Sequence, residues 1–109
     1  MAELHILDLQ CYGPQDPGGT DEASLQIDGV TVFGPQSMVL NDVVTVEVIH
    51  PFTGSVAVNL IEEDASPNPD ELLGTEIVTD SLPPYANTLA LFHANQPIGH
   101  YHMKYHIHP

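Results

Sequence analysis

The stretch LQIDGVTV at residues 25–32 decides the fold class of this 109-residue chain. Two short apolar and β-branched runs flank the pair Asp28-Gly29, which tolerates the positive φ angles that a two-residue type I′ turn requires. Runs of this kind around such a turn are typical of a β-hairpin. The stretch therefore predicts two antiparallel strands joined by a tight turn.

The same period of two continues on both sides of this hairpin. Val44, Val46 and Val48 alternate with polar neighbours, and residues 55–61 repeat the pattern, so each strand is expected to have one buried and one solvated face. Leu4–Cys11 is predicted as an earlier strand, and its mixed alternation indicates a β-bulge. Further strands are expected at residues 75–78, 88–93 and 99–107, which brings the total to about eight.

Turn-forming residues punctuate the whole length of the chain, with ten Pro and eight Gly. No segment has a sustained apolar period of 3.6 residues, and no repeat or linker divides the chain. A length of 109 residues fits one domain. We therefore expect an all-β protein in which residues 1–109 form a single antiparallel β-sandwich of about eight strands.

Charge excludes several classes of partner. Acidic residues number 15 against one basic residue, Lys104, which gives a formal net charge of −14. A nucleic-acid-binding protein needs basic side chains to neutralise phosphates, so that class is excluded. The same deficit argues against unaided attraction to anionic lipids. A chain of this charge attracts cations.

A single cysteine, Cys11, excludes an internal disulfide, and it is expected to be a small buried thiol rather than a nucleophile. No stretch approaches the roughly 18 consecutive apolar residues that a membrane helix needs. The first residues lack the basic region and cleavage site of a signal peptide. We therefore expect a cytoplasmic protein, or one exported by a route that its own sequence does not encode.

Two turn-like segments concentrate the acidic residues: QDPGGTDE at residues 15–22 and EEDASPNPDE at residues 62–71. Like charges crowded on a loop repel, and a fold that keeps them close usually offsets the repulsion with a bound cation. Carboxylate, carbonyl and amide oxygens suit Ca²⁺, which takes six to eight oxygen ligands, better than Mg²⁺. The alternative interpretation is that each segment is an ordinary solvated turn.

The order of these two segments resembles the C2 domain, a calcium- and lipid-binding β-sandwich. C2 domains carry a first loop of the form D-x-G-G-x-S-D-P-Y-V that leads into a strand, and DPGGTDEASL at residues 16–25 is similar to it. Their third loop reads D-x-D and is followed by a further acidic residue, which resembles EED at residues 62–64 followed by Asp70. The resemblance covers about residues 4–78.

The resemblance implies a C2-like sandwich whose two acidic loops hold Ca²⁺. It implies a non-enzymatic module that bridges through calcium to a lipid, glycan or protein partner. Carried over residue by residue, the family's calcium ligands fall on Asp16, Glu22, Glu62, Asp64 and Asp70, with Asp21 and Glu71 as near alternatives.

Four of the seven histidines fall in the last ten residues, where they alternate with Tyr, Met and Ile. On a strand, alternate side chains share one face, so the histidines and Lys104 are expected on the face opposite an aromatic row. The four are His100, His102, His106 and His108.

Three interpretations of this histidine strand remain open. It is a solvent-facing strand over a core-facing row, a Zn²⁺, Ni²⁺ or Cu²⁺ site, or a pH switch, because imidazole binds these ions and titrates near pH 6.5. His5, His50 and His93 have no partner in the sequence pattern and are expected to be isolated.

Catalytic motifs are lacking: the sequence has no GxSxG, HExxH, P-loop or dinucleotide fingerprint. We therefore expect no enzymatic activity. The alternative to a calcium-dependent module is a structural or assembly protein that docks on copies of itself or on a larger particle, with its acidic surface serving solubility.

Overall fold

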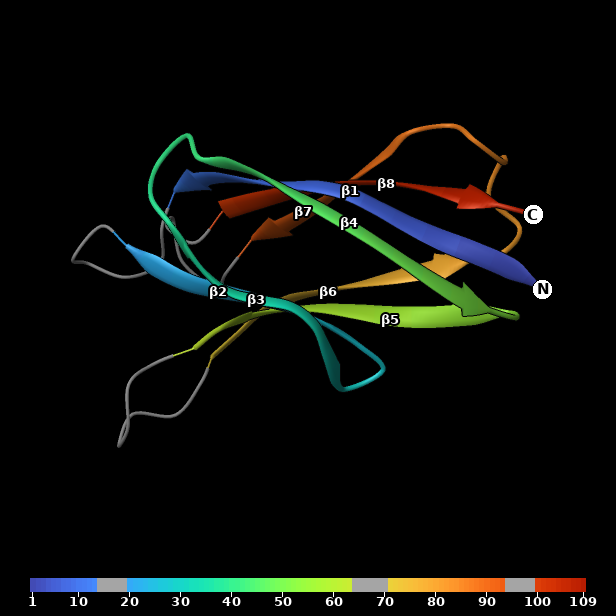
Figure 1. Ribbon diagram of the computed structural model, residues 1–109, viewed down its shortest axis with the longest axis horizontal. Helices are drawn as coiled ribbons and strands as arrows, with labels where there is room; N and C mark the ends of the chain where they lie inside the picture. The colour runs from blue at the N-terminus through green and yellow to red at the C-terminus, as the bar shows by residue number, and fades with distance from the viewer. Residues whose placement is uncertain (14–19, 64–70, 94–99) are drawn as a thin grey trace.

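The structure, a computed structural model, describes residues 1–13, 20–63, 71–93 and 100–109, with only the backbone of His93. Eight strands form two antiparallel four-stranded sheets that face each other (Figure 1). Sheet A has the order β4 (Val43–Phe52), β1 (Ala2–Gly13), β8 (His100–His108), β7 (Thr88–His93). Sheet B has the order β3 (Val30–Met38), β2 (Asp21–Ile27), β5 (Ser55–Glu62), β6 (Glu71–Thr79). The predicted all-β sandwich is confirmed.

Two local predictions about the strands are also confirmed. The β2–β3 hairpin turns at Asp28 and Gly29, whose φ angles are 49° and 87°. Both lie in the left-handed region that a type I′ turn requires, which Asp tolerates and Gly adopts without strain. The bulge in the first strand falls between Ile6 and Asp8, where the register of β1 shifts against both β4 and β8.

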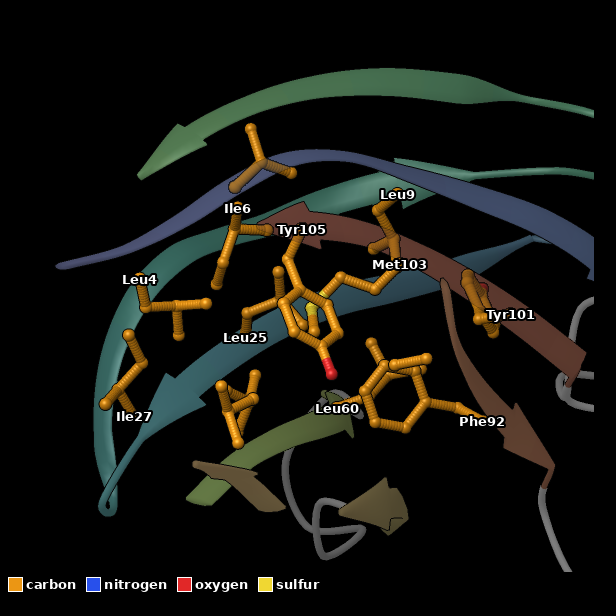
Figure 2. Packing of buried hydrophobic residues seen from close by; sticks show 14 of the residues in the cluster. Leu4, Ile6, Leu9, Leu25, Ile27, Leu60, Phe92, Tyr101, Met103 and Tyr105 are labelled. Atoms are coloured by element: carbon orange, nitrogen blue, oxygen red, sulfur yellow. The ribbon is translucent and has the colours of Figure 1, made fainter. Parts of the chain in front are cut away.

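Apolar side chains from the inner faces of both sheets fill the space between them (Figure 2). Leu4 and Ile6 of sheet A and Leu25 and Leu60 of sheet B are all fully buried. Burying a side chain of this size contributes about 1.5–3 kcal/mol. The inward series predicted for β5, namely Val56, Val58 and Leu60, is confirmed.

The last strand, β8, shows the predicted division into two faces. Its buried side chains are Tyr101, Met103, Tyr105 and Ile107, and the histidines and Lys104 between them are partly exposed. β8 pairs with β1 on one side and β7 on the other, so it is an interior strand of sheet A.

Strand β3 runs against a bulged part of β2, and Gly34 is the residue that permits this approach. Its φ of 89° is in the left-handed region, and a Cβ added there would overlap the carbonyl oxygen of Ala23. Glycine is therefore required at this position for two independent reasons. No helix long and apolar enough to cross a membrane occurs within the described ranges.

Candidate functional site

The strands that border the two acidic segments end side by side at one end of the sandwich (Figure 1). β5 ends at Glu62 and β6 begins at Glu71, and these two residues are register partners. Glu62 is also paired with Ala23 of β2, and the backbone N–H of Glu63 donates to the Glu22 carbonyl oxygen at 2.8 Å. Both acidic segments therefore attach to neighbouring strands here, and we call this the acidic end.

A buried hydrogen bond joins the two sheets at the acidic end. The Tyr101 hydroxyl on β8 donates to Asp21 Oδ2 on β2 at 2.6 Å, and both side chains are 0% exposed. Burial, reinforced by the Asp21 carboxylate, raises the pKa of the Tyr101 phenol well above its usual range. The bond holds Asp21 inside the sandwich and fixes how β8 lies over β2.

Cys11 lies beside this pair, as the register partner of Tyr101 on β1. Its side chain is fully buried, and burial raises the pKa of its thiol. A buried thiol with a raised pKa is a poor nucleophile, because the thiolate is the reactive form. The predicted burial of Cys11 is confirmed.

Glu62 and Asp21 both face the interior of the sandwich. Glu62 is 2% exposed because it continues the inward series that ends at Leu60, two residues earlier. Asp21 continues the inward series of β2 in the same way, two residues before Ala23. Two acidic side chains thus occupy inner-face positions at the acidic end.

The other described carboxylates at this end face outward or lie at the rim. Glu22 is exposed, and its Oε1 accepts a hydrogen bond from Ser37 Oγ at 2.8 Å. Glu63 is half-buried, and its Oε2 accepts a hydrogen bond from Ser24 Oγ. Glu71 is exposed at the start of β6. The two serines hold two of these carboxylates in place.

The seven predicted calcium ligands therefore have different positions. Asp16, Asp64 and Asp70 lie outside the described residues. Asp21 and Glu62 lie on the inner face of sheet B, whereas Glu22 and Glu71 are exposed. Buried residues alternate with less buried ones at the ends of β2 and β5 that carry these residues, and extending this alternation by two residues predicts inner-face positions for Asp21 and Glu62.

The donor chemistry at the acidic end fits Ca²⁺, because every candidate is a carboxylate. Within residues 1–13, 20–63, 71–93 and 100–109, however, no three carboxylates bring donor atoms within reach of one ion. The group of three donors that the structure does bring together is made of histidines. The calcium ligand set remains a prediction.

His5, His106 and His108 form this group, which we call the histidine cluster. One nitrogen from each ring lies within 4.8 Å of the others. The rings of His5 and His108 stack with centroids 3.6 Å apart, and His106 Nε2 lies 2.7 Å from His108 Nε2. His5 was expected to be isolated, and that expectation is wrong, because His5 and His106 are register partners on β1 and β8.

The structure separates His102 from His106 and His108. His102 is four residues from His106, which is about 13 Å along a strand, so it lies outside the cluster. Its ring instead contacts that of Tyr12, with centroids 4.1 Å apart. Burial and the neighbouring His108 and His5 lower the pKa of His106. Of the predicted metal strand, only His106 and His108 join the cluster.

Comparisons with known proteins support the fold. No protein-family model matches the chain, and no curated protein matches it. A structure of human GIVD cytosolic phospholipase A2 is similar with a TM-score of 0.53 and 13% identity over 97% of this chain. Another, of the same protein in complex with methyl gamma-linolenyl fluorophosphonate, gives a TM-score of 0.52 and 11% identity over 97% of this chain. The chain spans only 15% of the phospholipase chain in the first structure and 16% in the second.

Proposed function

We propose that this chain is a non-enzymatic, C2-like module that binds Ca²⁺ at the acidic end and through it a phospholipid surface. The observation that carries the proposal is the adjacency of β2, β5 and β6 there, which attaches both acidic segments to neighbouring strands. Crowded carboxylates on neighbouring loops repel, and a divalent cation offsets this repulsion.

The fold comparison supports the C2-like part of this proposal. Cytosolic phospholipase A2 contains a C2 domain, and the region similar to this chain is a small part of that enzyme. The likeness covers nearly the whole of this chain, as one domain inside a larger protein would. It agrees with the resemblance seen in the acidic segments.

The residues of this chain have distinct roles in the proposed site. Asp16, Asp64 and Asp70 would hold the ion together with the outward-facing Glu22 and Glu71. When bound, Ca²⁺ would supply coordination positions that a lipid phosphate can fill. The net charge of −14 repels an anionic membrane. Bound Ca²⁺ would neutralise carboxylates at the acidic end, so the chain would bind such a membrane only when calcium is present.

A thermal melt in EDTA, Ca²⁺ or Mg²⁺ tests calcium binding. A site with a dissociation constant of about 10⁻⁴–10⁻³ M gains roughly 1.4–2.7 kcal/mol at about 10 mM ion, or roughly 5–10 °C. We expect this rise with Ca²⁺ in the natural chain and its loss in Asp64→Asn with Asp70→Asn. An equal rise in that double variant would remove the second segment from the site.

A charge-matched control separates the site from the overall charge. Asp8→Asn with Glu47→Gln also removes two negative charges, but from sheet A, away from the acidic end. Asp8 forms a 3.8 Å ion pair with Lys104 in which both side chains are partly exposed, so the loss of this pair should cost little stability. This control should keep the calcium response, and it should sediment with anionic phospholipid vesicles in Ca²⁺ but not in EDTA. Glycan binding without vesicle binding would change the partner class.

An assembly role is the second candidate function, and exposed apolar residues favour it. Ile49 on β4 and Leu89 and Leu91 on β7 are 59%, 54% and 55% exposed. These strands are the two edges of sheet A. Size-exclusion mass measured against protein concentration tests docking on copies of the chain, and a monomer throughout would exclude that form of assembly.

A further inference from the structure

The histidine cluster lies at the opposite end of the sandwich from the acidic end, near the chain ends marked in Figure 1. The three histidines and Glu3 form two neighbouring register pairs between β1 and β8, on the outer face of sheet A. His5 faces His106, and Glu3 faces His108. Directly opposed residues in an antiparallel pair have Cβ atoms about 4.5–5.5 Å apart, which keeps all four side chains within reach of one another.

The separation of the ring nitrogens is close to that of ligands around one metal ion. Zn²⁺ binds imidazole nitrogen at about 2.0–2.1 Å in tetrahedral geometry, which places two ligand nitrogens about 3.3 Å apart. The three donors here lie within 4.8 Å of one another, and His106 Nε2 and His108 Nε2 lie 2.7 Å apart. All three histidines are partly exposed on the outer face of sheet A, so their rings have room to adjust toward this spacing.

Two of the three rings already have partners that orient them. Metal-binding histidines usually donate the other ring N–H to a carboxylate or a carbonyl oxygen. Glu3 Oε1 lies 3.3 Å from His5 Nε2, and Asn87 Oδ1 lies 3.3 Å from His106 Nδ1. Asn87 thereby leaves His106 Nε2 directed at His108. These two contacts match the partners that usually orient metal-binding histidines.

From this geometry we propose that His5, His106 and His108 bind one divalent transition-metal ion, with Zn²⁺ as the reference ion. Three imidazole nitrogens favour Zn²⁺, Cu²⁺ or Ni²⁺ over Ca²⁺, which takes oxygen ligands. Glu3 and Asn87 act as positioning residues. The site is independent of the proposed calcium site, because it lies at the other end and uses different donor atoms.

Metal binding at this place links the first and last strands of the sandwich. His5 belongs to β1, whereas His106 and His108 belong to β8. Because the two strands are neighbours in the middle of sheet A, the ion is a clamp between interior strands. Binding to the native state alone raises thermal stability as metal concentration rises.

Isothermal titration of the full chain with ZnCl₂ tests the proposal, using protein purified without a histidine tag. We expect one Zn²⁺ per chain and a tetrahedral Co²⁺ absorption spectrum when Co²⁺ replaces Zn²⁺. His106→Gln should lower the affinity by more than the roughly 10–100-fold that loss of a supporting partner costs. Asn87→Ala should lower the Zn²⁺ affinity by about 10–100-fold.

His102→Gln is the matched control, because it removes a histidine from the same strand and face but from outside the cluster. It should bind Zn²⁺ as the natural chain does. If His102→Gln and His106→Gln lose the same Zn²⁺ affinity, or if His106→Gln loses none, the assignment of the site is overturned. Urea unfolding in EDTA confirms that each variant folds, and an unchanged calcium melt in His106→Gln separates this site from the calcium site.

Discussion

The hydrogen bond between Tyr101 and Asp21 gives the sharpest test of how the two sheets are held together. Tyr101→Phe removes one oxygen atom and keeps the ring that packs in the core (Figure 2). The bond is 2.6 Å long, and both partners are 0% exposed. Its loss leaves the Asp21 carboxylate buried with one donor fewer.

The expected cost follows from the charge and burial of the acceptor. A hydrogen bond to a charged group contributes about 1.5–3 kcal/mol, and removing one partner of a buried pair adds a desolvation penalty. We therefore expect Tyr101→Phe to destabilise the fold by about 2–4 kcal/mol. For a chain of this length that corresponds to a fall of roughly 8–16 °C in melting temperature.

Urea unfolding followed by circular dichroism measures this cost, with Tyr105→Phe as the matched control. Tyr105 also donates to a carboxylate, Glu76 Oε2, at 2.9 Å, but this bond is only partly buried. Because solvent reaches this bond and screens the charge of Glu76, its loss should cost less than that of the buried bond, about 0.5–1.5 kcal/mol. If Tyr101→Phe costs no more than Tyr105→Phe, the bond to Asp21 does not stabilise the sandwich as argued. A double-mutant cycle with Asp21→Asn should give a coupling above about 1 kcal/mol.

Three further results are expected. The raised pKa of Tyr101 means that the folded state keeps a proton that the unfolded state releases, so stability should fall above pH about 10, and less steeply in Tyr101→Phe. Cys11 should react with a thiol reagent only at the rate of unfolding, and fast reaction in native conditions would contradict its burial. Gly34→Ala should destabilise far more than Gly54→Ala in thermal melts, because both have positive φ but only Gly34 lacks space for a Cβ.

Short-range patterns in the sequence predicted most of the fold. Asp28-Gly29 fixed a hairpin because its turn geometry depends on two adjacent residues alone. The division of β8 into a buried and an exposed face followed from strict alternation over nine residues. The inward faces of β4 and β5 followed in the same way, because the period of a strand is a local property.

The candidate sites depended on information that local patterns do not contain. The charge of Glu62 and Asp21 favours a loop position, whereas the period of two along β5 and β2 places both on inner faces. His5 was expected to be isolated because its partner, His106, lies about a hundred residues away, and the register between β1 and β8 is a tertiary property. β2 and β5, which border the two acidic segments, are neighbours in sheet B, whereas the calcium ligands that the family resemblance implies stay a prediction.

The position of β8 within sheet A also sets the order in which the chain acquires structure during synthesis. β1 is made first, but one of its two neighbours is the last of the eight strands to leave the ribosome. Until then β1 has only β4 beside it, β7 has no partner in its sheet, and the core lacks Tyr101, Met103 and Tyr105. Pairing across so long a sequence separation is slow because loop closure precedes any gain from contacts. A nascent chain stalled before residue 100 should therefore remain protease-sensitive, and protection should arise in a single late step.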